Sequence, residues 1–209
     1  MTYLSQIVVI VCLYGMYAIS LNLVLGYGGM LSLCQISLVG VGAYIYAGIT
    51  SWVSLTFIPA TALSIIGGVF AAALVAAATS RLRGDYFALS TISLLVFFQF
   101  VFLRWTDATG GAFGRRGISP PTIGTLQVNS PQAYALLMVL SLSIVLALCA
   151  FLTRGARGRS LKALRDDELA AVSLGYNPII LRTSILLLSG GVAGFAGALL
   201  ASYTGYIDS

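Results

Sequence analysis

The amino-acid sequence predicts an all-α, polytopic transmembrane bundle of about six spans. Of its 209 residues, 59% are hydrophobic and only 8% are charged, against roughly 25% charged residues in an ordinary soluble domain. No charged side chain precedes Arg81, and several apolar runs reach the roughly 20 residues that a membrane-spanning helix needs. Because these few polar groups cannot cover a water-exposed surface, the composition excludes a soluble enzyme.

The apolar runs define six predicted spans within one transmembrane domain, residues 1–209. Their approximate bounds are Tyr3–Leu25, Leu31–Thr50, Phe57–Ser80, Tyr86–Leu103, Gln132–Thr153 and Thr183–Tyr203. Membrane β-strands fit poorly, because they alternate apolar and polar residues in pieces of about ten and these runs are continuous. The first run lacks a basic start and is too long for a signal peptide, so we expect it to be retained as a span.

The break between the first two spans has two interpretations. The sequence Gly26-Tyr-Gly-Gly29 is followed by polar residues at Ser32, Gln35 and Ser37. This stretch is either a tight turn between two spans or an unwound segment within the membrane. Unwound backbone is tolerated at that depth only where protein buries it or where it faces a cavity.

Basic residues predict the orientation of the bundle. The segment 154–182 holds six and the link 81–85 holds two, which together are Arg81, Arg83, Arg154, Arg157, Arg159, Lys162, Arg165 and Arg182. The loop 104–131 holds three, Arg104, Arg115 and Arg116. The positive-inside rule predicts that 81–85 and 154–182 are cytoplasmic and that 104–131 and both termini are external. Because the charges cluster at span ends, topology and anionic membrane lipid explain the net charge of +5 better than nucleic acid does.

Small residues recur at every fourth position of the third span, namely Ala60, Ser64, Gly68, Ala72, Ala76 and Ser80. A second row in the sixth span consists of Gly190, Gly194 and Ala198. Because lipid provides no hydrophobic drive between helices, close approach through small residues is what holds membrane bundles together. Both rows therefore predict packing of helix against helix.

Three polar side chains lie inside apolar runs: Asn22, Gln35 and Gln99. Each has two interpretations, an interhelical hydrogen bond or the lining of a translocation path. No ionisable group lies among them, so a proton relay and a membrane enzyme are disfavoured. Histidine is absent, and no phosphate-binding or dinucleotide-binding glycine motif occurs. We therefore expect no catalytic residue, no metal and no cofactor.

The segment 154–182 contains helical signals. Ser160 is predicted to cap a helix, or a pair of shorter helices, running through 161–174. Gly175 suits the left-handed position after a helix, and Pro178 prevents continuation. The segment is either a solvated surface loop or a docking surface, and its apolar positions and mixed charges favour docking.

Several motifs carry a resemblance to a known family. Residues 169–175 (LAAVSLG) resemble the coupling loop of ABC importer permeases, with Glu168 one place earlier than the glutamate of that loop. Further motifs resemble the LivM-type permeases of branched-chain amino acid importers. They are 21–33 (LNLVLGYGGMLSL), 40–44 (GVGAY), 82–88 (LRGDYFA), Trp105-Thr106, 109–111 (TGG), 158–168 (GRSLKALRDDE) and 193–199 (AGFAGAL).

The resemblance implies a permease subunit of an ABC importer in the bacterial plasma (inner) membrane, which works by alternating access. Its implied partners are a second permease subunit, ATPase subunits that hydrolyse ATP, and an external solute-binding protein. Branched-chain amino acids are the implied substrates, with other amino acids, urea and short amides open. Segment 154–182 would be the cytoplasmic coupling loop, with contacts to the ATPase at Arg165, Asp166, Asp167, Glu168, Ala170, Ala171 and Gly175.

The chain departs from the family pattern at some positions. Leu95, Val96 and Gln99 stand where the family often has Gly-Glu and, three residues later, Arg, and Phe113 replaces a polar residue. Family members usually carry further spans beyond Ser209, which predicts C-terminal truncation; a fragment, a truncated gene product and a short relative all fit. The rival interpretations are a non-transporting assembly subunit and a channel or secondary transporter.

Overall fold

The computed structural model describes residues 2–52, 56–118, 121–123, 126–127 and 130–208. Six helices in this part of the chain have 18 residues or more: α1 (Thr2–Asn22), α2 (Gln35–Trp52), α3 (Phe57–Thr79), α4 (Asp85–Arg104), α6 (Pro131–Arg154) and α9 (Pro178–Thr204). Shorter helices are η1 (Leu23–Tyr27, a π-helix), α5 (Thr106–Thr109), η2 (Gly111–Phe113), α7 (Ala156–Asp166) and α8 (Glu168–Ser173). All six predicted spans correspond to helices.

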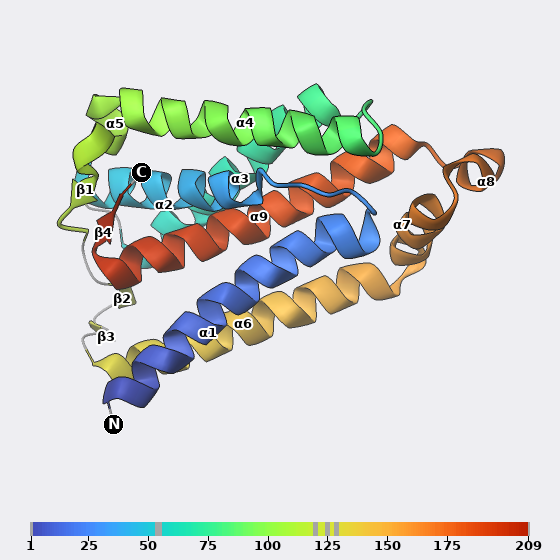
Figure 1. Cartoon of the computed structure of the whole chain (residues 1–209). Coiled ribbons are helices and arrows are strands. Elements are labelled where there is room, and N and C mark those ends of the chain that lie inside the picture. Colours follow the sequence, from blue (N-terminus) through green and yellow to red (C-terminus); the bar gives the residue numbers. More distant parts are fainter. Residues whose placement is uncertain (1, 53–55, 119–120, 124–125, 128–129, 209) are drawn as a thin grey trace.

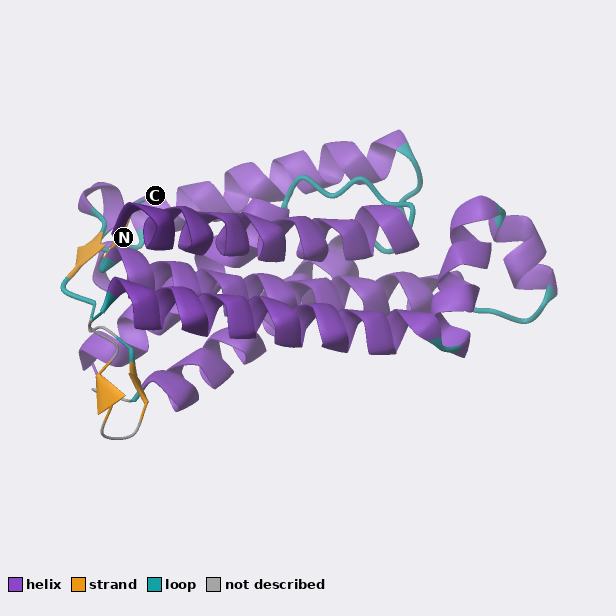
Figure 2. Cartoon of the chain, turned by 90° about the horizontal axis from the view of Figure 1, so that it is seen from below, coloured by secondary structure: helices purple, strands orange, loops and turns teal. Residues whose placement is uncertain are grey.

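Four two-residue strands complete the secondary structure of the described residues. β1 (Arg115–Arg116) pairs antiparallel with β4 (Tyr206–Ile207), and β2 (Thr122–Ile123) pairs antiparallel with β3 (Leu126–Gln127). The first pair joins the loop after α5 to the residues that follow α9. Both pairs lie at one end of the helical bundle, and α7 and α8 project from the other end (Figures 1 and 2).

The two basic segments predicted to share one side of the membrane lie together. The link 81–85, before α4, and the helices α7 and α8 occupy the same end of the bundle (Figure 1); we call this the basic end. The start of α1, the loop after α4 and β4 lie at the opposite end. The expected alternation of helix direction is therefore confirmed.

Five of the helical spans among the described residues are long and apolar enough to cross a membrane. These spans are Tyr3–Tyr27, Phe57–Thr79, Asp85–Arg104, Pro131–Arg154 and Pro178–Thr204. The sixth long helix, α2, contains three glycines and two tyrosines, and most of its side chains are buried. Other helices of the bundle therefore cover most of its surface.

The connection between α1 and α2 is an unwound segment, residues 28–34, and not a tight turn. It runs back along the bundle from the end of η1, so that α2 begins part of the way along the neighbouring helices (Figure 1). Its residues alternate between buried and exposed, with Met30, Ser32 and Cys34 facing inward. The Leu33 N–H donates a hydrogen bond to Thr91 Oγ1 at 3.2 Å. Protein thus buries one side of this backbone, as membrane depth requires.

Helix α9 forms the centre of the bundle and packs on α3 and α2 through small residues. A Cβ atom on Gly68 would collide with the Gly190 carbonyl oxygen, and one on Gly194 would collide with the Ser64 carbonyl oxygen. Gly42 of α2 approaches the Gly194 backbone equally closely. The two predicted rows of small residues therefore face each other, which confirms the packing prediction.

Two local predictions near the basic end were wrong. Ser160 lies inside α7, which begins at Ala156, and does not cap a helix. Helix α9 begins at Pro178, five residues before the predicted Thr183. The Asn177 side chain accepts hydrogen bonds from the Ile179 and Ile180 N–H groups, and proline suits the first helical position because it has no N–H to satisfy. Pro178 thus prevents α8 from continuing and also provides the first residue of α9.

Candidate translocation pocket and coupling surface

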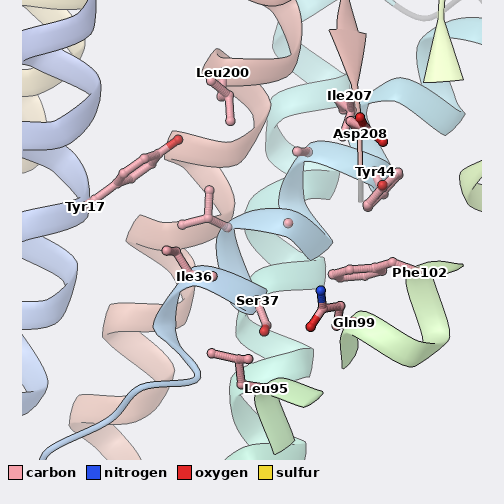
Figure 3. A pocket seen from close by; sticks show the side chains of 13 residues that line it. Tyr17, Ile36, Ser37, Tyr44, Leu95, Gln99, Phe102, Leu200, Ile207 and Asp208 are labelled. Carbon is pink, nitrogen blue, oxygen red and sulfur yellow. The ribbon is translucent and has the colours of Figure 1, made fainter. Parts of the chain in front are cut away.

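A pocket of about 400 Å³ lies beside the first turns of α2 and faces α4. Its walls are mostly apolar, and the polar side chains include Tyr17 of α1, Ser37 of α2 and Gln99 of α4. Figure 3 shows Ser37 and Gln99 on neighbouring walls and Tyr17 across from them. Among the described lining residues, Asp208 alone is charged. Such a lining suits a small, largely apolar solute with a few hydrogen-bonding groups.

The Tyr17 hydroxyl has no hydrogen-bond partner among the described residues, although the atom is buried. A buried polar group without a partner is costly in an apolar environment. Its position in the pocket wall makes it available to a polar atom of a bound solute. Tyr17 was not predicted from the sequence, although Tyr17 and Ser20, three residues apart, mark one polar face of the first span.

Gln35, a predicted path residue, belongs to a buried polar cluster next to this pocket. Its side chain is 6% exposed, and its Nε2 donates to Ser20 Oγ and, at 3.4 Å, to the Ser189 carbonyl oxygen. Ser20 Oγ donates to the same carbonyl at 2.9 Å. Gln35 therefore joins α2 to α1 and α9. Its Oε1 has no partner among the described residues. The interhelical hydrogen bonds therefore satisfy the Nε2 atom of the side chain but not the Oε1 atom.

The three predicted path residues do not meet at one place. Gln99 lines the pocket with an exposed side chain, and Gln35 adjoins the lining residues Ile36 and Ser37. Asn22 is exposed at the last residue of α1, and a Cβ atom on Gly26 would collide with its Oδ1. The structure thus groups two of the three predicted residues around the start of α2 and leaves Asn22 at the turn into η1.

At the basic end, α7 and α8 form a helical hairpin with a defined break. Asp167 Oδ1 accepts hydrogen bonds from the Leu169 and Ala170 N–H groups at 2.8 and 3.1 Å and so caps α8. Gly175 has φ of +86°, with its N–H bonded to the Val172 carbonyl. The left-handed glycine predicted from the sequence is confirmed.

Glu168 connects α8 to two other parts of the bundle. Its carboxylate lies 3.0 Å from Arg182 Nη2 of α9 and 3.1 Å from Arg83 Nη2 in the link before α4. The side chains of Glu168 and Arg182 are only 19% and 12% exposed, whereas Arg83 is 70% exposed. From the sequence, both arginines predicted only the orientation of the bundle, because nothing in the sequence indicates contacts over such separations.

The outer surface of α8 is apolar. Leu169 and Val172 of α8, and Leu174 directly after it, are 78%, 49% and 73% exposed. Ala170 is also exposed, whereas Ala171 is 1% exposed and points into the protein. Both alanines were predicted to contact the ATPase, and the burial of Ala171 corrects this: only Ala170 lies on the outer surface.

The remaining predicted coupling residues lie at the end of α7. Asp166 is exposed and accepts a hydrogen bond from the Nε of its neighbour Arg165 at 3.1 Å. The Arg165 Nη1 turns inward and donates to the Gly26 carbonyl oxygen at 2.7 Å. In the predicted coupling loop, side chains such as Asp166 and Ala170 therefore face outward, where a partner could contact them. Arg165 and Glu168 instead hold the loop to the bundle.

Comparisons with known proteins identify the family. The family model described as branched-chain amino acid transport system / permease component matches residues 3–209. The high-affinity branched-chain amino acid transport system permease protein LivM of Salmonella typhimurium is 32% identical over 221 residues, which cover 94% of this chain and 52% of that protein. The Escherichia coli LivM protein is 31% identical over 228 residues, covering 97% and 53% respectively.

The chain spans about half the length of the curated relatives it matches. No solved structure matches it significantly. Together with the five helices able to cross a membrane, the relatives indicate a multi-pass protein of the bacterial plasma membrane. The match over residues 3–209 shows that the chain belongs to the family of permease components of branched-chain amino acid transport systems.

Proposed function

We propose that this chain is a permease subunit of an ABC importer that carries branched-chain amino acids or related small polar solutes across the plasma membrane. Transport would be driven by ATP hydrolysis on separate ATPase subunits. The observation that carries the proposal is the family match over nearly the whole chain, joined to a helical hairpin that presents an apolar surface at the basic end of the bundle.

The outer surface of α8 is the proposed contact with the ATPase. Exposed leucine side chains on a short helix that projects from a membrane bundle suit insertion into a cleft of a partner protein. Helix α8 is also held to α9 and to the link before α4 through Glu168. Closure of the ATPases on ATP would push α8, and these ion pairs would pass the movement to two membrane helices.

The pocket between α2 and α4 is the proposed solute path within this chain. Its apolar walls fit an aliphatic side chain, and the Tyr17, Ser37 and Gln99 side chains offer neutral hydrogen-bonding groups. Helix α4 is the least buried of the five candidate spans, so its movement would disturb few contacts. Opening and closing of this pocket by α4 would provide alternating access.

The remaining partners follow from this assignment. A second permease subunit would cover membrane faces that this chain leaves exposed, such as the outward side of α4. With the basic end in the cytoplasm, an external solute-binding protein would meet the opposite end, where α5 and the strands lie.

Reconstitution of the complex into lipid vesicles tests the proposal. The chain would be purified with the ATPase subunits, the second permease subunit and the binding protein of the same system. We expect ATP-dependent uptake of radiolabelled leucine that requires this chain and the binding protein. Assembly with ATP hydrolysis but no uptake would favour the assembly-subunit alternative, and uptake without ATP would favour a channel or secondary transporter.

A further inference from the structure

The contact between Arg165 and Gly26 joins parts of the chain that are 139 residues apart in sequence. Arg165 closes α7, and Gly26 lies in η1, immediately before the unwound segment 28–34. The 2.7 Å hydrogen bond runs from the guanidinium Nη1 to the backbone carbonyl oxygen. A bond to the main chain fixes the backbone from which this segment starts, and not only the position of a side chain.

The Gly26 carbonyl is available because the helical ladder ends in η1. The last carbonyls of a helix have no partner within it. The Leu23, Val24 and Leu25 carbonyls accept hydrogen bonds from the N–H groups of Gly28, Met30 and Gly29, respectively. The Gly26 carbonyl accepts from Arg165 instead, and a cation at a helix C-terminus also stabilises the helix dipole.

Other contacts hold α7 against the same turn. Leu161, one helical turn before Arg165, is 5% exposed and packs in the cluster that contains Leu23 and Val24. The Lys162 Nζ lies 5.5 Å from the centre of the Tyr27 ring. Gly29 has φ of +64°, and a Cβ atom there would collide with Arg165 Cγ. The arginine side chain thus fills the space that the glycine leaves.

The unwound segment leads from this contact to the proposed solute pocket. It is bonded to α4 through Leu33 and Thr91, and it ends at Cys34, two and three residues before the pocket residues Ile36 and Ser37. A displacement of α7 would therefore reach the start of α2 through continuous backbone. Only the carbonyl bond of Arg165 connects a charged side chain of α7 to that backbone among the described contacts.

We propose that Arg165 is a positioning residue that ties the α7–α8 hairpin to the unwound segment, so that movement of the hairpin moves the start of α2. The role rests on the proposed function, because the movement is supplied by the ATPase. It differs from the coupling role predicted from the sequence: Arg165 acts inward, on the permease itself, and not on the ATPase surface.

The natural Cys34 provides a direct probe, because its side chain is fully buried in the unwound segment. With Cys12 and Cys149 replaced by alanine, the rate of Cys34 modification by N-ethylmaleimide would be measured on the full chain in lipid nanodiscs. We expect Arg165→Ala to raise this rate on the order of three- to tenfold, a modest factor because the arginine is 44% exposed. The matched control is Arg159→Ala, an exposed arginine of the same helix, which should leave the rate unchanged.

Equal labelling of parent, Arg165→Ala and Arg159→Ala would overturn the proposal. If Arg165→Ala yields no folded protein, Arg165→Lys replaces it in the same comparison. We then expect a smaller rise in the rate of Cys34 modification, and an unchanged rate would contradict the positioning role of Arg165. In the reconstituted complex, Arg165→Ala should lower leucine uptake per ATP hydrolysed; a proportional loss of both activities also contradicts a positioning role. Absence of uptake by the parent complex would refute the proposed function, whereas the Cys34 comparison would still decide whether Arg165 holds the segment.

Discussion

Gly68 of α3 and Gly194 of α9 pack backbone against backbone: a Cβ atom placed on Gly194 would lie 3.1 Å from the Gly68 Cα atom. No side chain intervenes between the two helices at this crossing. In a membrane, such contacts stabilise the bundle through van der Waals packing, because lipid supplies no hydrophobic drive for association. The contact therefore fixes the position of the central helix on which the pocket and the coupling hairpin depend.

We expect Gly68→Leu to lower the free energy of unfolding by about 1–3 kcal/mol, because a leucine must displace the α9 backbone. The monodisperse yield in size-exclusion chromatography and the Tm in detergent measure the effect. Leu74→Ile is the matched control, since Leu74 is 53% exposed on the same helix and should tolerate the change. Equal yields for both variants would remove the packing argument.

Topology gives a second prediction. A cysteine at Phe113, which is 86% exposed and lies in η2 between α5 and β1, should react with an impermeant thiol reagent on intact cells. Cysteines at Asp166 or Ser173 should react only after the membrane is opened, because the positive-inside rule places the basic end in the cytoplasm. Reaction at Ser173 from outside the cell would reverse the orientation and, with it, the proposed ATPase contact.

The helices themselves were predictable, since each span is a continuous apolar run of the length that a bilayer requires. The facing of Gly68 and Gly194 was also partly predictable, because small residues recur at helical spacing on both spans. The course of the segment 28–34 was not, since a glycine-rich break is compatible with both a turn and unwound backbone. In the structure, residues 28–34 alternate between buried and exposed, which shows that the backbone is unwound there.

The candidate site was less accessible to sequence analysis. Glu168 was predicted to contact an ATPase, and its partners Arg83 and Arg182 lie far away in sequence. Ala170 and Ala171 look equivalent in sequence, and only the packing of α8 shows that Ala171 is buried. Tyr17 was missed because an aromatic residue in an apolar run is usually a packing residue, and only its unpartnered hydroxyl distinguishes it.

The Glu168 ion pairs give a third prediction. Arg182→Ala should lower the free energy of unfolding by about 2 kcal/mol, because it leaves a mostly buried carboxylate without its more buried partner. Arg83→Ala should cost less than about 1 kcal/mol, since Arg83 is 70% exposed. Thermal unfolding of the two variants in parallel measures the difference. A larger loss for Arg83→Ala than for Arg182→Ala contradicts this assignment.

Gly175 gives a fourth prediction. Gly175→Val should reduce substrate-stimulated ATP hydrolysis by the assembled complex while leaving membrane insertion intact. A β-branched residue disfavours the φ of +86° that turns the chain after α8. Nothing lies within 4 Å of a Cβ atom there, so backbone strain and not a clash causes the effect. Gly175→Asn should retain most of the stimulation, because asparagine tolerates the left-handed region; an equal loss in both variants argues against backbone conformation as the cause.

If α8 couples this permease to an ATPase, an Ala170→Arg substitution should break the coupling. Ala170 is exposed among the apolar side chains of α8, so a long cation there should block docking without disturbing the core. ATP hydrolysis and leucine uptake would be measured together in the reconstituted complex, with Ala170→Ser, a small substitution at the same position, as control. We predict that Ala170→Arg abolishes stimulated hydrolysis and uptake while Ala170→Ser retains both. Full activity of an Ala170→Arg complex would show that α8 does not couple this permease to an ATPase.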